Sequence, residues 1–242
     1  DYASVYTSLA EGLNQIGKAQ EAVGYCEKAL LLNPDLAEAW FNQGNILQAL
    51  GRKDQALVCY EQSVAINPDY IQGHYNHGIL LKAMGRPDDA LKSYQRAIVI
   101  NPAYAEPFLN QGVILMEKSL HNEALKAYET ALMIRPDYAE AYNNQALVHM
   151  NLGNLQSALS SYSLAVANQH DSAQILSNLG LALMDLNNIA QALVVYDRAI
   201  ELNPKYAEAH INRALALKEA RRFDEALLAC ETALKLKGDY AE

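Results

Sequence analysis

Residues 37–70 read AEAWFNQGNILQALGRKDQALVCYEQSVAINPDY, and this pattern returns every 34 residues along a chain of 242. The most regular column is alanine, at Ala22, Ala56, Ala90, Ala124, Ala158, Ala192 and Ala226. Prolines recur at the same interval, at Pro34, Pro68, Pro102, Pro136 and Pro204. A period of about 20–50 residues is typical of a solenoid, in which each unit buries its apolar face against its neighbours. The chain therefore divides into seven repeats: 3–36, 37–70, 71–104, 105–138, 139–172, 173–206 and 207–240.

Each repeat is predicted to form two helices. In the second repeat, residues 37–50 contain Gly44 as their one helix breaker, and Gly51 then begins a turn. The second helix is predicted over residues 55–66, because Pro68 lacks an amide donor and disfavours helix in the residue before it. Glycine holds the same turn at Gly17, Gly85 and Gly153, and Ser119, Asn187 and Arg221 replace it elsewhere. Since no segment has the two-residue period of a strand, we predict an all-α fold.

The second repeat resembles the tetratricopeptide repeat in Trp40, Gly44, Leu47, Ala56, Tyr60 and Pro68, with Ser63 in place of the usual alanine. The resemblance covers essentially the whole chain. It implies one right-handed superhelical solenoid over residues 3–240, built of antiparallel helix pairs whose first helices line a concave groove that binds proteins or peptides. Ala241-Glu242 resemble the start of a further repeat, so we expect a fragment of a longer protein.

An asparagine column is the main functional feature of the sequence. It fills the sixth position of six repeats, at Asn42, Asn76, Asn110, Asn144, Asn178 and Asn212. Asparagine is a mediocre helix former, so its presence inside six helices has no local explanation. In the family this position faces the groove, which implies a ladder of amides, and an amide can pair with the backbone of an extended peptide whatever its side chains are. The alternative is that the asparagines only bridge neighbouring helices and stabilise the stack.

Two further columns give the expected groove its character. Position nine is polar in the first two repeats and then apolar, at Ile79, Val113, Leu147 and Leu181. Position twelve holds Lys82, Met116, Met150 and Met184, and the methionines form a strip that adapts to ligands of varied shape. Acidic residues lie beside these columns, for example Glu140 and Asp185. We expect a preference for extended segments with apolar residues in the middle and basic residues at the flanks, although helix dipoles alone also favour acidic helix starts.

Related families suggest three functions. Chaperone-binding tetratricopeptide domains hold the carboxylate of a ligand with cationic side chains at positions two, five and six of the first helix. This chain lacks those cations, so a clamp of that type is not expected. The asparagine column and the runs at 139–144 and 203–209 are similar to the repeat regions of O-linked N-acetylglucosamine transferases, where the ladder holds protein substrates. The first prediction is a scaffold that binds an extended peptide. The alternatives are a substrate-recruiting segment of such a transferase and a structural array that self-associates end to end.

Composition excludes several other classes. The net charge of −9 and the lack of a basic stripe argue against nucleic acid. No apolar run reaches the roughly 18 residues of a membrane span. His74 and His77 are three residues apart, but no further ligand follows at a usable spacing, so neither a metal nor a cofactor is expected. No catalytic motif is found, and an enzyme is not expected.

The cysteines point to a reducing compartment. Cys26, Cys59 and Cys230 are odd in number and lie in or beside the packing column of the second helices. We therefore expect buried thiols that replace tyrosine rather than disulfides or a redox centre. Together with the lack of a signal segment, this favours the cytoplasm.

Overall fold

A computed structural model describes residues 2–169 and 171–238, so the expected start of a further repeat at 241–242 lies outside the described residues. The described residues are divided between two compact units, Asp1–Ile114 and Leu115–Glu242. They form fourteen α-helices and no strand, as the repeat pattern predicts. The first unit contains α1 (Tyr2–Gln15), α2 (Ala19–Leu32), α3 (Ala37–Ala49), α4 (Lys53–Ile66), α5 (Ile71–Ala83), α6 (Pro87–Ile100) and most of α7 (Ala105–Glu117). The second contains α8 (His121–Ile134), α9 (Ala139–Asn151), α10 (Leu155–Asn168), α11 (Ala173–Asp185), α12 (Ile189–Leu202), α13 (Ala207–Glu219) and α14 (Phe223–Gly238).

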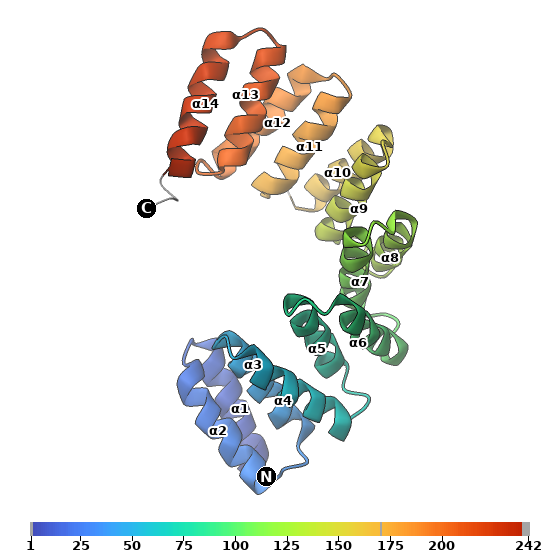
Figure 1. Ribbon diagram of the computed structural model, residues 1–242, viewed down its shortest axis with the longest axis vertical. Coiled ribbons are helices and arrows are strands. Elements are labelled where there is room, and N and C mark those ends of the chain that lie inside the picture. Colours follow the sequence, from blue (N-terminus) through green and yellow to red (C-terminus); the bar gives the residue numbers. More distant parts are fainter. Residues whose placement is uncertain (1, 170, 239–242) are drawn as a thin grey trace. The chain divides into compact units, whose positions relative to one another are not determined.

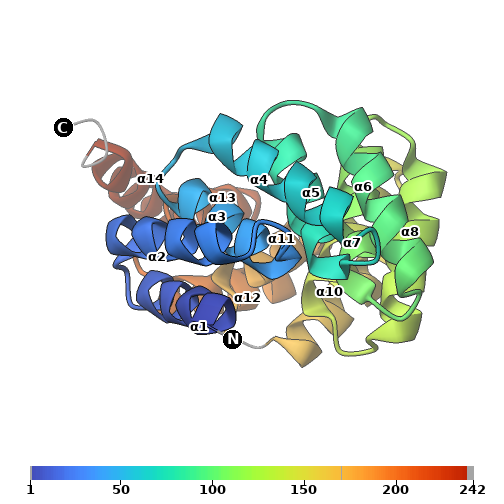
Figure 2. The same ribbon diagram turned by 90° about the horizontal axis from the view of Figure 1, so that it is seen from below.

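Inside each unit the helices pack as consecutive hairpins. Within the first unit α1 packs on α2 and also on α3, and within the second α11 packs on α12 and α13 (Figure 1). In the view from below, α1 and α2 lie along each other (Figure 2). The first helices of successive repeats therefore contact one another inside a unit, which brings equal repeat positions side by side. One continuous solenoid over residues 3–240 stays a prediction.

Local sequence sets the limits of each helix. The helix α4 begins at Lys53, two residues before the predicted start, and Asp54 in its first turn is favoured there by the positive end of the helix dipole. It ends before Asn67, which has the extended φ of −122° that a following proline demands. The turn before α4 needs a left-handed residue, supplied by Gly51 with φ 74°. Arg221 adopts φ 58° at the equivalent turn, which confirms that the turn is kept where glycine is replaced.

A column of tyrosines occupies the second helices of the five middle repeats. Its members are Tyr60, Tyr94, Tyr128, Tyr162 and Tyr196, all essentially fully buried. The facing residue must be small, because a Cβ added at Gly44 would lie 2.7 Å from Tyr60 Cε1 and one at Gly180 only 2.3 Å from Tyr196 Cε1. Close helix crossing and a large aromatic ring are thus matched within the same repeat.

The hydroxyl groups of this column have different surroundings. The Tyr60 hydroxyl lies 2.7 Å from Asn45 Oδ1 and 3.0 Å from Gln48 Oε1. The hydroxyl of Tyr196 is buried without a hydrogen-bond partner in the described part of the chain, because the residue equivalent to Asn45 is Leu181. Burial raises the pKa of both tyrosines, so both phenols stay neutral.

We expect Tyr60→Phe to lower the free energy of unfolding by about 1 kcal/mol, since it removes a made hydrogen bond. Tyr196→Phe should leave stability unchanged or raise it, since it removes a buried group that pairs with nothing. Chemical denaturation followed by circular dichroism measures both changes. Equal losses in the two variants would contradict this difference.

Two of the three cysteines are buried as expected. Burial raises the pKa of Cys26 to about 12 and that of Cys59 to about 11, so both thiols stay protonated. The expectation is wrong for Cys230, which is exposed. The reason is local, because no further first helix packs over α14 among the described residues.

Candidate functional site

The predicted asparagine column lies on the first helices, and in the first unit it bridges them. Asn76 Nδ2 donates to Asn45 Oδ1 at 2.9 Å. Asn110 Nδ2 donates to the Tyr75 hydroxyl at 3.0 Å. Asn42 is buried, and its Nδ2 has no partner in the described ranges 2–169 and 171–238. The bridging role that the sequence left open is therefore present in this unit.

The second unit repeats the arrangement with different acceptors. Asn178 Nδ2 donates to Asn143 Oδ1 at 3.0 Å, and Asn143 Nδ2 in turn donates to Asn144 Oδ1 at 3.2 Å. Asn212 Nδ2 donates to Ser177 Oγ at 3.1 Å. In both pairs the donor lies 35 residues after its acceptor, so position six of one repeat bonds to position five of the repeat before it.

These bonds fix the orientation of four amides. The Oδ1 atoms of Asn76, Asn110, Asn178 and Asn212 accept no hydrogen bond from any described residue. All four residues are half-buried. Since the Nδ2 group is already used, the group that each amide has left for a ligand is its carbonyl oxygen, which accepts N–H donors.

Sequence reasoning missed the acceptors at position five. They are Tyr75, Asn143 and Ser177, and position five of the other repeats includes Phe41, Leu109 and Ile211. The signal that would have found them is a polar residue followed, 35 residues later, by asparagine. No family pattern at position five draws attention to it, because its residue type varies from repeat to repeat.

We call positions six, nine and twelve of the first helices the ladder face. In the first unit they include Asn45, Gln48, Ile79, Lys82 and Val113, all half-buried. In the second unit they include Leu147, Leu181, Leu215, Met116, Met150 and Met184. Leu147, Met150 and Met184 pack partly against the core, whereas Leu181 and Leu215 are 41% and 52% exposed. The apolar part of the ladder face that a ligand can reach is therefore centred on these two leucines.

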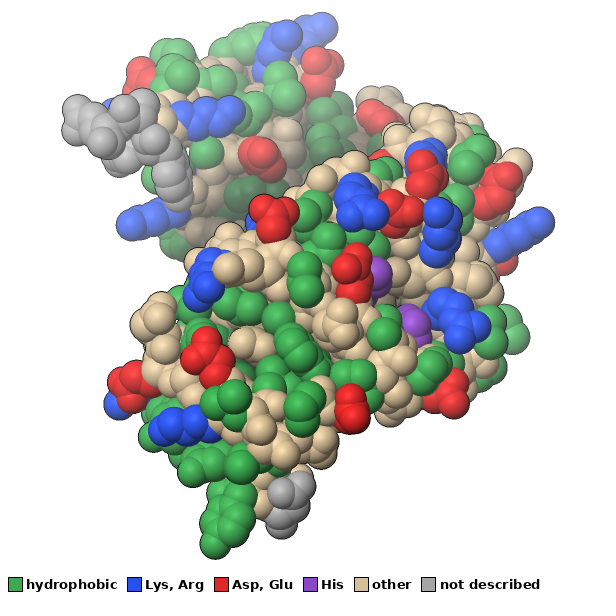
Figure 3. All heavy atoms as spheres, turned by 60° about the horizontal axis from the view of Figure 1, so that its bottom comes forward, with side chains coloured by type: hydrophobic (Ala, Val, Ile, Leu, Met, Phe, Trp, Pro, Cys, Tyr) green, Lys and Arg blue, Asp and Glu red, His purple; other side chains and the backbone are tan. Residues whose placement is uncertain are grey.

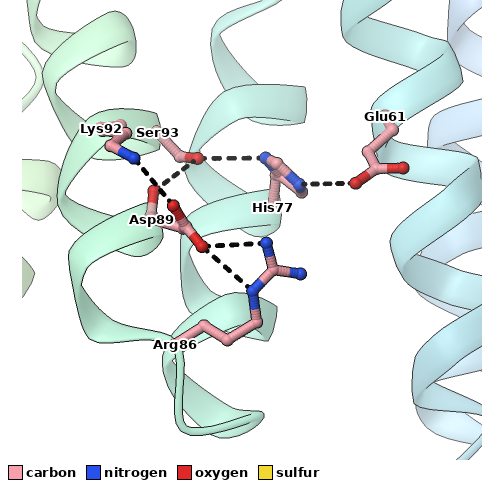
Figure 4. Close-up of polar contacts among 6 residues, drawn as sticks. All are labelled: Glu61, His77, Arg86, Asp89, Lys92 and Ser93. Atoms are coloured by element: carbon pink, nitrogen blue, oxygen red, sulfur yellow. Dashed lines mark hydrogen bonds and ion pairs between the residues drawn. The ribbon is translucent and has the colours of Figure 1, made fainter.

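A second polar cluster joins α5 to α6 (Figure 4). The Ser93 hydroxyl lies 3.0 Å from His77 Nδ1 and 3.2 Å from the Asp89 carbonyl oxygen. His77 Nε2 lies 4.0 Å from Glu61 Oε1 on α4. Burial, together with the neighbouring His74 and Arg86 and against an opposing effect of Asp89, lowers the pKa of His77 to about 4. The imidazole is therefore neutral at physiological pH.

This cluster is a structural link and not a nucleophile with its base. Ser93 is only 6% exposed, so its hydroxyl is out of reach of a substrate. The equivalent pair in the fifth repeat is Ser161 and Gln145, whose side chains bond at 2.9 Å without any titrating group. Nearby, Arg86 and Lys92 each hold Asp89 at 2.9 Å. These bonds lower the pKa of the Asp89 carboxyl.

A metal centre and a membrane span are two other kinds of site, each with its own requirements for the described residues. No group of three His, Cys, Asp or Glu residues that could hold a metal is found in the part of the chain that the structure describes. His74 Nε2 instead lies 2.9 Å from the Pro68 carbonyl oxygen. On the surface visible in Figure 3, Lys and Arg side chains are scattered among acidic and uncharged ones. None of the helices within 2–169 and 171–238 combines the length and apolarity of a membrane span.

The comparisons with known proteins agree with the helix pairs. Tetratricopeptide repeat models match residues 37–70, 71–104, 139–169 and 177–241, and a TPR repeat model matches 112–153. No curated protein sequence matches the chain.

Solved structures match over most of the chain. PilW, a type IV pilus biogenesis factor, is 22% identical with a TM-score of 0.75, over 86% of this chain and 96% of PilW. A tetratricopeptide repeat protein from Parabacteroides merdae is 15% identical with a TM-score of 0.74, over 97% and 93%. YrrB, described as a TPR protein with an unusual peptide-binding site, is 21% identical with a TM-score of 0.60, over 76% and 95%. The six helix hairpins inside the two units and the tetratricopeptide repeat models that match the sequence show that the chain belongs to the tetratricopeptide repeat family, whose members are scaffolds for protein–protein interaction.

Proposed function

We propose that the ladder face of the chain binds an extended segment of a protein partner. The observation that carries this proposal is the set of amide oxygens left without a hydrogen bond, on Asn76 and Asn110 in the first unit and on Asn178 and Asn212 in the second, each oriented by an Nδ2 group that donates to the preceding repeat. An extended backbone presents N–H donors that such oxygens accept, whatever its side chains are. The peptide-binding site for which YrrB is described supports the same use of the fold.

The spacing of the asparagines suits an extended chain. Packed helices lie roughly 8–10 Å apart and an extended chain rises roughly 3.3 Å per residue, so each asparagine meets about every third ligand residue. Such contacts give affinity but little sequence preference. Preference then comes from the neighbouring columns, through apolar ligand side chains over Leu181 and Leu215 and basic ones beside exposed acidic residues such as Glu140 and Asp185. The affinity should therefore fall as salt is raised.

The test uses peptides of about 16 residues, selected from a random displayed library on the immobilised chain and titrated by fluorescence anisotropy. We expect Leu181→Ser with Leu215→Ser to weaken binding at least about tenfold, because both exposed leucines lose apolar contact. Val194→Ser is the matched control, since Val194 is 67% exposed on the second helix α12. Equal affinity of all three proteins would overturn the proposal.

A second pair of variants separates binding from stacking. Ser177→Ala removes the acceptor of the inter-helix bond but keeps the Asn212 amide, whereas Asn212→Ala removes both. If the amide oxygen holds the ligand, only Asn212→Ala should weaken affinity, by roughly fivefold for one lost hydrogen bond. Equal affinities with equal losses of stability would mean that the column serves the stack alone.

A further inference from the structure

A pocket of about 750 Å³ lies in the first unit, between α2, α3 and α4. It is lined by Trp40 and Leu47 of α3, by Leu31 of α2 and by Val58 of α4. Leu31 is 82% exposed and Val58 is 52% exposed, so this apolar surface meets water.

The pocket is separate from the ladder face. Trp40, Gln43 and Leu47 hold positions four, seven and eleven of the second repeat. Because each residue turns a helix by about 100°, these positions point away from positions six, nine and twelve. A ligand in this pocket therefore leaves the asparagine column open to a second one.

The charge at the pocket rim is not compensated within the structure. At the junction of α12 and α13 the acidic residue at this position of the second helix, Asp197, pairs with the basic Arg213 at position seven of the next repeat, at 2.5 Å. At the junction of α4 and α5 the facing residue is the neutral His77, 4.0 Å from Glu61. At the junction of α2 and α3 position seven is Gln43, and Glu27 has no ion pair among the residues described. The Glu27 carboxylate can therefore pair with a cation of a ligand, and it lies beside an exposed apolar pocket.

We propose that this pocket is a second docking site, which binds a short amphipathic helix of a protein partner. Its walls are two helices, and a third helix packs against helices at roughly 8–10 Å with apolar anchors three and four residues apart. The apolar anchors lie over Trp40, and a lysine or arginine of the partner lies beside Glu27. Arg52 at the other rim donates to Gln55, so the partner's cation is directed to the α2 side.

Trp40 gives a direct test, because it is the one tryptophan of the chain. The probe is a helical peptide of about 14 residues with leucines at i, i+4 and i+7, a lysine at i+3 and a dansyl group at its end. We expect saturable quenching of Trp40 emission by energy transfer to the dansyl group. A control peptide with glutamate in place of that lysine should bind at least about fivefold more weakly. The absence of saturable quenching up to about 1 mM peptide would overturn the proposal.

Three variants localise the site. Val58→Asp should weaken binding of the lysine peptide at least about tenfold, because it places a charge on an apolar wall. Val194→Asp, at the equivalent repeat position in the second unit, is the matched control and should have no effect. Glu27→Gln should abolish the preference for lysine over glutamate. Equal effects of Val58→Asp and Val194→Asp, or a preference that survives Glu27→Gln, would contradict the assignment.

Binding of the lysine peptide to this pocket is expected to be independent of the ladder face. Leu181→Ser with Leu215→Ser should leave binding of the lysine peptide unchanged, even where it abolishes binding of the selected extended peptides. A loss of both activities in that variant would mean that the helical peptide occupies the ladder face, and would overturn the second site.

Discussion

Gly180→Val is expected to lower the free energy of unfolding of the second unit by about 3 kcal/mol, the largest effect among the predicted substitutions. A Cβ at Gly180 would lie 2.3 Å from Tyr196 Cε1 and 2.6 Å from Tyr196 Cζ. The ring is fully buried, so it cannot move aside without opening the contact between α11 and α12. Valine adds two methyl groups beyond that Cβ, and the hairpin must separate to admit them.

Two controls give this prediction its sign and scale. Ala146 occupies the equivalent position beside Tyr162 in the fifth repeat, so Gly180→Ala should cost less, about 1 kcal/mol. Gly12 lies inside α1 with nothing within 4 Å of an added Cβ, and Gly12→Ala should stabilise the first unit by about 0.5–1 kcal/mol. Because repeat arrays unfold by parts, the measurement is amide hydrogen exchange in α11 and α12 together with chemical denaturation. Unchanged exchange in Gly180→Val would contradict the tight contact.

Acid is expected to destabilise the first unit through His77. Its folded-state pKa of about 4 lies below its ordinary value of 6.5, so the fold favours the neutral ring. The sign follows from proton linkage: the unfolded chain binds the proton first, so stability is full above pH 6.5, falls towards about pH 4 and then levels off. The shift corresponds to about 3 kcal/mol at most. Because the side chain is 16% exposed, we expect about 2 kcal/mol.

The matched variant is His77→Gln, because glutamine and serine already make this link at Gln145 and Ser161. This variant should keep the bond to Ser93. Between pH 7 and pH 4 its free energy of unfolding should fall by about 2 kcal/mol less than that of the parent protein, as measured by denaturation at each pH. Glu61→Gln keeps the imidazole and should retain the acid sensitivity. A parent and a His77→Gln variant with the same pH dependence would show that other groups cause it.

The 34-residue period of the sequence was sufficient to predict the helices, but it did not predict the contacts of individual side chains. The Gly51 turn, the buried Tyr60 and the end of α4 before Pro68 follow from residue types whose backbone and packing needs are strong and local. The start of α4 differed by two residues, because helix beginnings are set by weaker preferences.

The candidate site could be predicted only in part. The asparagine column was recognised, but its amides have partners that depend on side-chain reach between repeats, which the period does not encode. Ser177, which accepts a hydrogen bond from Asn212, and the apolar Leu109 hold the same repeat position. The repeat pattern alone therefore does not show which asparagines bond to the preceding repeat. The exposure of Cys230 likewise depends on what packs over α14 and not on its own column.

Three of the Nδ2 donors, Asn110, Asn178 and Asn212, lie 35 residues after their acceptors, and this offset has a consequence for how such a chain can change in length. Donor and acceptor belong to different repeats. Duplicating or deleting one whole 34-residue repeat therefore recreates the pairing at the new boundary whenever position five is polar. Inserting a single residue into a first helix instead rotates every later side chain of that helix by about 100° and breaks the pair. Duplication of complete repeats is therefore the route by which this array can gain further bridging asparagines without breaking the hydrogen bonds of those it has.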